Sequence, residues 1–322
     1  MSKVKSVVLG IILVVLVGAI VFFIANPNIF TKKEEDNGKI KLISSNFASY
    51  DFLRAITKDV DGIEVSFLMG PGKDAHSYEP TAQDLIKIQK SDLFVYIGGE
   101  MEKWSDKVIS ANESDKNNTF CIADYADKID EEEIDGAEEE EEEEEEGAFD
   151  EHIWTSPANA IKMINALESK VEELDKNNSA KYKSNAEAYI KQINDVDSEI
   201  KTIVENKKRD RLVFGDKMPM QYFMKYYGLT ASAAFNGCST ETDPSAATIA
   251  YLENRIKDEK IPVVLYIELN NGRVANTIAN ETGCKAMQIQ TLHNVSLDDF
   301  NNGETWVSLM KKNVDVLKVA LQ

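Results

Sequence analysis

Apolar and polar positions form two blocks along the chain, and each block predicts short buried strands alternating with amphipathic helices. In the first block the strand-like runs are rich in Ile, Val, Leu and Phe, and the runs between them have helical spacing. The predicted strands span 40–44, 63–69, 93–97 and 120–123, and the predicted helices span 50–58, 81–90 and 103–111. This βαβα order predicts a parallel sheet with helices on both faces.

The second block repeats the pattern after two long helical segments. Those segments span 156–174 and 180–206, and apolar residues recur every three to four positions in the second of them. The second block then predicts strands at 211–214, 262–267 and 286–290, with helices at 220–227, 246–259, 273–282 and 306–321. The fold class is therefore α/β, with two lobes of similar build.

The N-terminus has the pattern of a membrane segment. Lys3 and Lys5 precede an uncharged apolar run from 6 to 25, close to the roughly 20 residues that cross a bilayer as a helix. A signal-peptide core is shorter, about 7 to 15 residues, so an uncleaved anchor over 1–25 is favoured over a cleaved signal. The positive flank places the rest of the chain outside the cytoplasm, behind a polar tether at 26–38.

Charge and cysteine content limit the function. The formal net charge of −20 argues against nucleic acid as a partner and is compatible with attracting cations. Residues 131–147 include nine consecutive glutamates and predict a disordered loop, either a solvated spacer or a weak cation trap. The three cysteines, Cys121, Cys238 and Cys284, allow one disulfide with one free thiol, or three thiols.

The chain has only three histidines, and each follows a predicted strand or precedes a helix. His76 comes after the strand at 63–69 and a Gly-Pro-Gly turn, which lifts it to the edge of the sheet where ligands bind in open α/β folds. His152 stands just before a helix N-cap at Ser156, and His293 follows the last strand. A lone loop histidine is more often a surface residue, so the flanking sequences decide.

Those flanks resemble the metal-binding solute receptors of bacterial ABC importers, which bind zinc or manganese. The matching motifs are Gly-Pro-Gly-Lys-Asp-Ala-His-Ser-Tyr-Glu-Pro at 70–80, Gly-Gly before Trp104, and Asp-Glu-His-Ile-Trp at 150–154. The resemblance covers 39–322 and implies an N-terminal lobe at 39–178, a connecting helix at 179–207 and a C-terminal lobe at 208–322. It also implies that His76 and His152 are metal ligands.

The C-terminal lobe departs from the family pattern. His293 stands where the family commonly has an acidic ligand, and Lys217 falls where it has a histidine or glutamate. A protonated lysine cannot ligate, so Glu241 is the predicted fourth ligand, with Asp216 and Glu268 as alternates or a water in their place. For each of these carboxylates, solvation or capping is the more ordinary role. The family's lipidated cysteine is also missing, since no cysteine precedes Cys121.

Three imidazoles with one oxygen donor suit tetrahedral Zn²⁺, whereas a site richer in carboxylates would suit Mn²⁺. We expect a monomeric extracytoplasmic receptor that is not an enzyme, binds one divalent metal in the cleft between its lobes and delivers it to the permease of an ABC importer. Two alternatives are a zinc-dependent hydrolase and a surface adhesion protein with a structural metal. The hydrolase lacks an HExxH helix or GxSxG elbow to supply its base or nucleophile.

Overall fold

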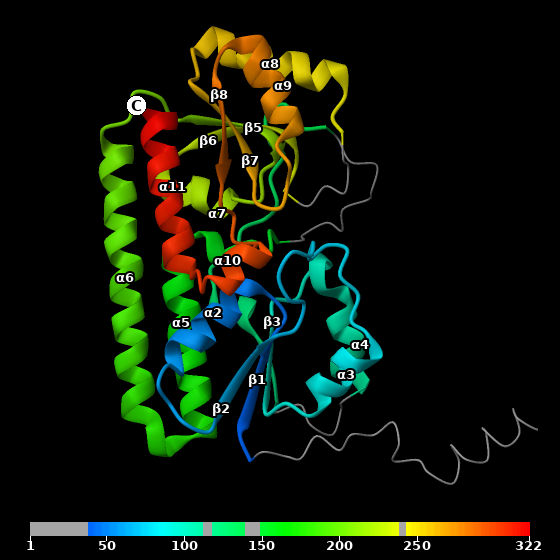
Figure 1. The fold of residues 1–322 in the computed structure, drawn as a ribbon, viewed down its shortest axis with the longest axis vertical. Helices are drawn as coiled ribbons and strands as arrows, with labels where there is room; N and C mark the ends of the chain where they lie inside the picture. The colour runs from blue at the N-terminus through cyan, green and yellow to red at the C-terminus, as the bar shows by residue number, and fades with distance from the viewer. Residues whose placement is uncertain (1–37, 112–117, 139–148, 238–242) are drawn as a thin grey trace, which may run out of the picture. The chain divides into compact units, whose positions relative to one another are not determined.

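Two parallel four-stranded sheets form the framework of the protein (Figure 1). The structure is a computed structural model that describes residues 38–111, 118–138, 149–237 and 243–322. The first sheet has the strand order β2-β1-β3-β4 and the second has the order β6-β5-β7-β8. Every pairing in both sheets is parallel. The strands are β1 (Ile40–Ser44), β2 (Ile63–Phe67), β3 (Leu93–Tyr96), β4 (Thr119–Cys121), β5 (Arg211–Lys217), β6 (Thr230–Phe235), β7 (Val263–Ile267) and β8 (Lys285–Ile289).

Helices connect the strands, as parallel pairing requires. The first sheet is accompanied by α2 (Phe47–Ile56), α3 (Ala82–Gln89) and α4 (Lys103–Ala111), and the second by α7 (Gln221–Tyr227), α8 (Ala246–Glu259), α9 (Arg273–Thr282), α10 (Leu297–Asn301) and α11 (Trp306–Leu321). Local sequence explains where several of them begin. Thr81, for example, forms a capping box with Asp84 at the start of α3. The predicted two-lobed α/β fold is thereby confirmed.

One strand was not predicted from the sequence. β6 reads Thr-Ala-Ser-Ala-Ala-Phe, a run of small residues with weak strand propensity, yet its last four residues are buried. It pairs with β5 and completes the second sheet. Its small side chains leave room for neighbours to pack closely, and tertiary packing rather than propensity places this strand.

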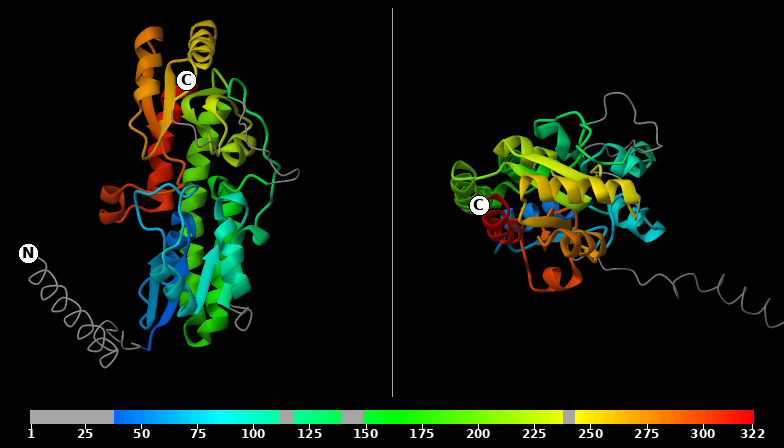
Figure 2. Two further views of the ribbon diagram at one scale, coloured as in Figure 1. Left: turned by 90° about the vertical axis from the view of Figure 1, so that its right-hand side faces the viewer. Right: turned by 90° about the horizontal axis from the view of Figure 1, so that it is seen from above.

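Two long helices run beside the sheets (Figures 1 and 2). α5 (Pro157–Leu174) begins at the Ser156 N-cap with proline in its first turn, and α6 (Ser179–Glu205) follows after a short 3₁₀ turn. α6 packs against α5, α2 and α11, while α11 also packs against β5 and β8. The apolar stripe predicted on the second long helical segment is the buried face of α6, from Tyr182 to Ile203.

A buried carboxylate joins three of these helices. Asp51 of α2 accepts a hydrogen bond from the backbone N–H of Trp306, at 2.8 Å, and another from the hydroxyl of Tyr189 on α6. Burial raises the pKa of Asp51 although both hydrogen bonds favour its charged form. The start of α11 is therefore tied to elements that pack on the first sheet.

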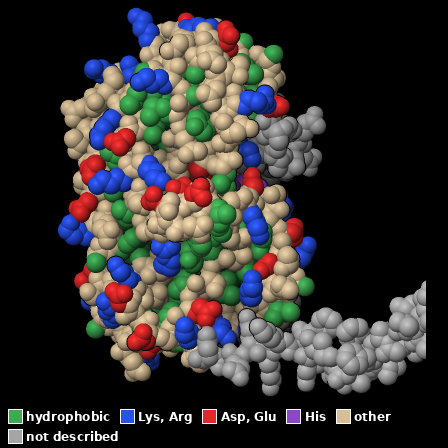
Figure 3. All heavy atoms as spheres, in the orientation of Figure 1, with side chains coloured by type: hydrophobic (Ala, Val, Ile, Leu, Met, Phe, Trp, Pro, Cys, Tyr) green, Lys and Arg blue, Asp and Glu red, His purple; other side chains and the backbone are tan. Residues whose placement is uncertain are grey.

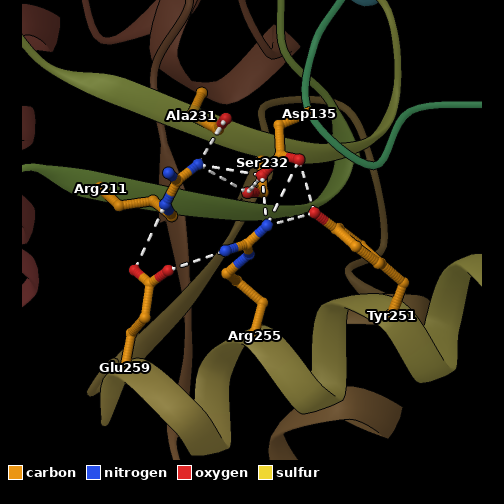
Figure 4. A network of polar contacts seen from close by, with 7 residues as sticks. All are labelled: Asp135, Arg211, Ala231, Ser232, Tyr251, Arg255 and Glu259. Atoms are coloured by element: carbon orange, nitrogen blue, oxygen red, sulfur yellow. Dashed lines mark hydrogen bonds and ion pairs between the residues drawn. The ribbon is translucent and has the colours of Figure 1, made fainter.

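The beginning of the acidic segment is ordered, which differs from the predicted disordered loop at 131–147. Asp135 and Glu138 make parallel bridges to Ser232 and Phe235 of β6. The Asp135 carboxylate also accepts hydrogen bonds from Arg211, Arg255 and Tyr251 (Figure 4). Paired charges and an unpaired strand edge explain why residues up to 138 dock on the second sheet. Residues 139–148 lie outside the described part of the chain.

The described surface carries both signs of charge over both sheets. Lysine and arginine side chains are interspersed with aspartate and glutamate on the face shown in Figure 3. Cys121 and Cys284 are free thiols, and Cys238 lies outside the described residues. Residues 1–37, with the predicted anchor and nearly all of the tether, also lie outside them. No helix in the described ranges combines the length and apolarity that a membrane crossing needs.

Candidate metal site

The loop after β2 carries His76 toward the second sheet. Gly70 and Gly72 have positive φ values of 74° and 78°, a conformation that favours glycine and turns the chain sharply. The backbone N–H of Gly72 donates to the carbonyl of Val295, at 2.8 Å, which ties this loop to the loop after β8. The Asp74 carboxylate accepts the backbone N–H of His76, at 2.9 Å. His76 is thus held between the two sheets.

His152 immediately precedes the 3₁₀ turn Ile153–Thr155 that leads into α5, and it is almost completely buried. The Asp150 carboxylate accepts hydrogen bonds from the His152 backbone N–H and from the ring Nδ1, both at 2.8 Å. An Nδ1–H that donates to a carboxylate leaves the lone pair on Nε2, which is the tautomer that a metal requires. Trp154, two residues further on, packs its ring edge against the imidazole. Asp150 therefore fixes both the position and the tautomer of His152.

His293 is positioned by Glu268, which directly follows β7. The Glu268 carboxylate accepts the backbone N–H of Thr291 at 2.7 Å, the Thr291 hydroxyl at 2.7 Å and the backbone N–H of His293 at 3.0 Å. Leu292 between them has a positive φ of 62°, so the turn depends on these contacts. The indole of Trp154 stacks parallel to the His293 ring and donates to the Thr291 carbonyl.

The structure brings the three histidines together. One ring nitrogen from each of His76, His152 and His293 lies within 4.8 Å of the other two. The Nε2 atoms of His76 and His152 are buried, and each lacks a hydrogen-bond partner among the residues that the structure describes. Leaving such atoms unpaired costs about 1–3 kcal/mol each, so their convergence fits a cation that accepts their lone pairs.

Burial and neighbouring charges shift the pKa values of the three imidazoles in different directions. The pKa of His76 falls to about 3, because burial disfavours its charged form and His152 adds repulsion. Burial, and then repulsion from His76, also lowers the pKa of His293 well below its usual value. Burial acts the same way on His152, but the Asp150 carboxylate outweighs it and raises that pKa. At neutral pH, His76 and His293 are therefore already in the neutral form that ligates a metal.

A cleft of about 600 Å³ opens beside the cluster. His76 and His293 line it together with Lys217, whose Nζ lies 3.8 Å from the Asp74 carboxylate across the two lobes. Nearby polar groups from the second sheet, including Asn270 and Asp216, complete the wall. The cleft gives a cation a polar path to the buried nitrogens.

The three carboxylates that the sequence suggested as a fourth ligand have different outcomes. Glu241 lies outside the described residues. Asp216 accepts the backbone N–H groups of Ile267, at 3.0 Å, and Lys217, at 2.8 Å, and burial raises its pKa. Glu268 also spends its oxygens on N–H and O–H donors, and its pKa is likewise raised by burial. Among the described histidines, cysteines, aspartates and glutamates, the group that converges comprises the three histidines.

Sequence reasoning named Asp150 only as part of a motif and Glu268 only as an alternate ligand. Each of these carboxylates positions a histidine, but only the contact of Asp150 could be expected from spacing in the sequence. Asp150 acts two residues from His152, a local distance that was available as a signal. Glu268 acts on a loop 23 residues away, and only the pairing of β7 with β8 brings the two together.

Comparison with known proteins assigns the chain to a family. Residues 43–320 match the family described as zinc-uptake complex component A, periplasmic. The high-affinity zinc uptake system protein ZnuA of Bacillus subtilis is 31% identical over 91% of this chain and 92% of its own length. The zinc-binding lipoprotein AdcA of Streptococcus pneumoniae is 29% identical over 89% of this chain, which spans only 57% of that relative's length.

Solved structures agree with this assignment. The metal-dependent lipoprotein YcdH of Bacillus subtilis has a TM-score of 0.75 at 27% identity, covering 88% of this chain and 100% of its own. The Zn(II)-bound ZnuA-like domain of Streptococcus pneumoniae AdcA has a TM-score of 0.73 at 28% identity, covering 88% of this chain and 99% of its own. The chain belongs to the periplasmic zinc-uptake component A family.

Proposed function

We propose that this chain is the extracytoplasmic receptor of a zinc importer, which binds Zn²⁺ through His76, His152 and His293 and delivers it to the permease of an ABC transporter. The observation that carries the proposal is the convergence of three imidazole nitrogens within 4.8 Å. Relatives named for zinc binding and zinc uptake support it. Members of this family are solute-binding receptors rather than enzymes, so the bound metal is cargo and needs no catalytic group beside it.

The donor set favours zinc over manganese. Zn²⁺ takes imidazole nitrogens readily at about 2.0–2.1 Å, whereas Mn²⁺ favours carboxylate and water oxygens. The fourth donor that we propose is Glu241, with Asp216 and Glu268 as alternates. Asp216 would have to give up a hydrogen bond that joins β5 to the end of β7, and Glu268 one that holds the loop after β8, which favours Glu241.

Binding in this arrangement would draw the lobes together. The N-terminal lobe, 39–178, supplies His76 and His152, and the C-terminal lobe, 208–322, supplies His293. The connecting helix at 179–207 would limit their relative movement. We propose that the receptor acts as a monomer held at the outer face of the membrane by residues 1–25 through the tether at 26–38. The glutamates that follow Glu138 would serve as a spacer or weak cation trap beside the cleft.

Calorimetric zinc titration of single alanine variants tests the proposal. His76→Ala, His152→Ala and His293→Ala should each weaken zinc binding by about 100-fold or more, since each removes a donor rather than a supporting group. Lys225→Ala is the control, because Lys225 is exposed and pairs with Glu132 rather than with any residue of the cluster in the contacts described. Wild-type affinity in any one of the histidine variants would contradict the three-histidine site.

A further inference from the structure

A buried thioether lies against the histidine cluster. The Sδ atom of Met101 is 3.3 Å from Nε2 of His293, and the Met101 side chain is only 4% exposed. Met101 belongs to a single 3₁₀ turn, η2 (Glu100–Glu102), that follows β3. Its sulfur therefore lies within hydrogen-bond distance of a ring nitrogen of His293, one of the three histidines of the proposed zinc site.

Met101 is held in this position by Glu151, the residue next to His152. Gly98 and Gly99 have φ values of 84° and 78°, and a Cβ on Gly99 would lie 2.3 Å from the Glu151 carboxylate. That carboxylate accepts the backbone N–H of Met101, at 2.9 Å. Glu151 immediately precedes His152, so the thioether and the imidazole are positioned by one stretch of chain. Their proximity is built into the fold.

The sulfur–nitrogen distance matches that of two donors on one ion. Donors about 2.0–2.3 Å from a tetrahedral metal lie about 3.3–3.7 Å from each other. The 3.3 Å between Met101 and His293 falls in that range. The ring nitrogens of the three histidines lie within 4.8 Å of one another, so the thioether borders the same donor cluster.

Thioethers select metals differently from carboxylates. Zinc sites in proteins use cysteine, histidine and carboxylate donors, whereas the soft sulfur of methionine favours Cu(I). We propose that this site also binds a cuprous ion, with Met101 Sδ joining the nitrogens of His76, His152 and His293. The inference rests on the proposed function, because it uses the same histidines. It makes Cu(I) and Zn²⁺ mutually exclusive ligands of the receptor.

A second buried methionine provides a matched control. Met69 is 2% exposed, and its Sδ atom lies 3.3 Å from the side-chain amide nitrogen of Asn294. The two methionines are thus both almost fully buried, and the two sulfur contacts have the same length, but in those contacts Met101 meets an imidazole and Met69 an amide. Leucine replaces methionine with little change in packing volume, so Met101→Leu and Met69→Leu should both fold.

The test is an anaerobic Cu(I) titration of the full chain against bathocuproine disulfonate, with zinc titrations of the same proteins. Met101→Leu should weaken Cu(I) binding by about tenfold or more and change zinc affinity by less than about threefold. Met69→Leu should leave both affinities near wild type. Unchanged Cu(I) affinity in Met101→Leu, equal losses for both metals, or no Cu(I) binding by the wild type would each overturn the proposal.

X-ray absorption at the copper edge gives a second, independent reading. The wild-type Cu(I) complex should show one sulfur neighbour that disappears in Met101→Leu, and a nitrogen-only spectrum in the wild type would overturn the inference. The zinc titrations separate the two proposals. Failure of the wild type to bind zinc refutes the proposed function, whereas normal zinc binding with Cu(I) indifferent to Met101 refutes only this inference.

Discussion

The two sheets share one strand order but differ in the side chains that their loops and strand ends bring to the metal site. In each sheet the strand that comes first in the chain lies between the second and third strands. The first sheet's connections carry two imidazoles, His76 and His152. The second sheet contributes one imidazole, His293 in the loop after β8, together with the cation of Lys217 at the end of β5. A repeated scaffold therefore places its loops alike, and the loop residues decide what each lobe contributes.

The supporting carboxylates differ in the same way. Asp150 contacts the ring nitrogen of the histidine that it supports, whereas Glu268 contacts only backbone and hydroxyl donors around His293. The first carboxylate acts on the tautomer and charge of an imidazole, and the second acts on the shape of a loop. Substituting each should therefore change zinc binding to a different extent.

Among substitutions of the supporting residues, the largest effect is expected for Asp150→Asn. An amide can present its NH₂ to Nδ1 and move the ring proton to Nε2, which blocks ligation by His152, so zinc affinity should fall about 10- to 100-fold. Competition titration with a zinc chelator measures it. Asp124→Asn is the control, since Asp124 is exposed and pairs only with Lys128 on the surface among the contacts described. An unchanged affinity in Asp150→Asn would remove the distinction between the two carboxylates.

The pH dependence follows from the unequal imidazoles. His76, with a pKa of about 3, and His293, with a strongly lowered pKa, carry no proton that zinc must displace near neutrality. His152 has a raised pKa and does carry one below it. Zinc affinity should thus be flat at high pH and fall about tenfold per pH unit once the pH drops below the His152 pKa.

Titrations between pH 8 and 5.5 check this slope. Three free histidines with ordinary pKa values would instead release up to three protons, and affinity would fall much more steeply below about pH 6.5. In Asp150→Asn the fall should begin at a lower pH, because the carboxylate that raises the His152 pKa is gone. A steep slope in the wild type, corresponding to the release of two or three protons, would contradict the conclusion that only His152 must lose a proton when zinc binds.

A smaller effect is expected for Glu268→Gln. The amide keeps one acceptor oxygen but opposes an NH₂ group to donors from Thr291 or His293, which should destabilise the zinc-free protein by about 1–3 kcal/mol. Zinc affinity should fall only about three- to tenfold, because the imidazole itself is untouched. Urea unfolding and zinc titration measure the two quantities, with the exposed Glu281→Gln as control. A loss of affinity without loss of stability would indicate that Glu268 is itself a ligand.

Much of this architecture could be predicted from the sequence. Apolar periodicity predicted the strands and helices of both lobes except β6 and the short helix α10, and the three histidines were singled out by their flanking motifs. β6 was missed because its small residues have no strand-like pattern and depend on neighbours for burial. The docking of Asp135 on β6 was missed because the surrounding glutamates masked a specific set of arginine partners. Both β6 and the docked Asp135 depend on contacts between residues far apart in the sequence, which composition and local pattern do not predict.

The smallest effect is expected for Lys217→Ala. The Lys217 charge opposes a cation in the cleft, and it contributes to lowering the pKa of His76 and His293. Its removal should leave zinc affinity unchanged or tighten it by up to about threefold, since its charge is partly offset by Asp74. Calorimetry against Lys225→Ala as control measures it. A tenfold weaker site would mean that Lys217 supports the zinc-bound state.

Zinc-edge X-ray absorption of the loaded chain counts the donors around the metal and so shows whether both lobes ligate the same ion. We expect three imidazoles at about 2.0–2.1 Å, with one further light donor, and only two imidazoles in a His293→Ala sample loaded at saturating zinc. A wild-type spectrum with two or fewer imidazoles, or an identical spectrum from His293→Ala, would contradict a site shared by the two lobes.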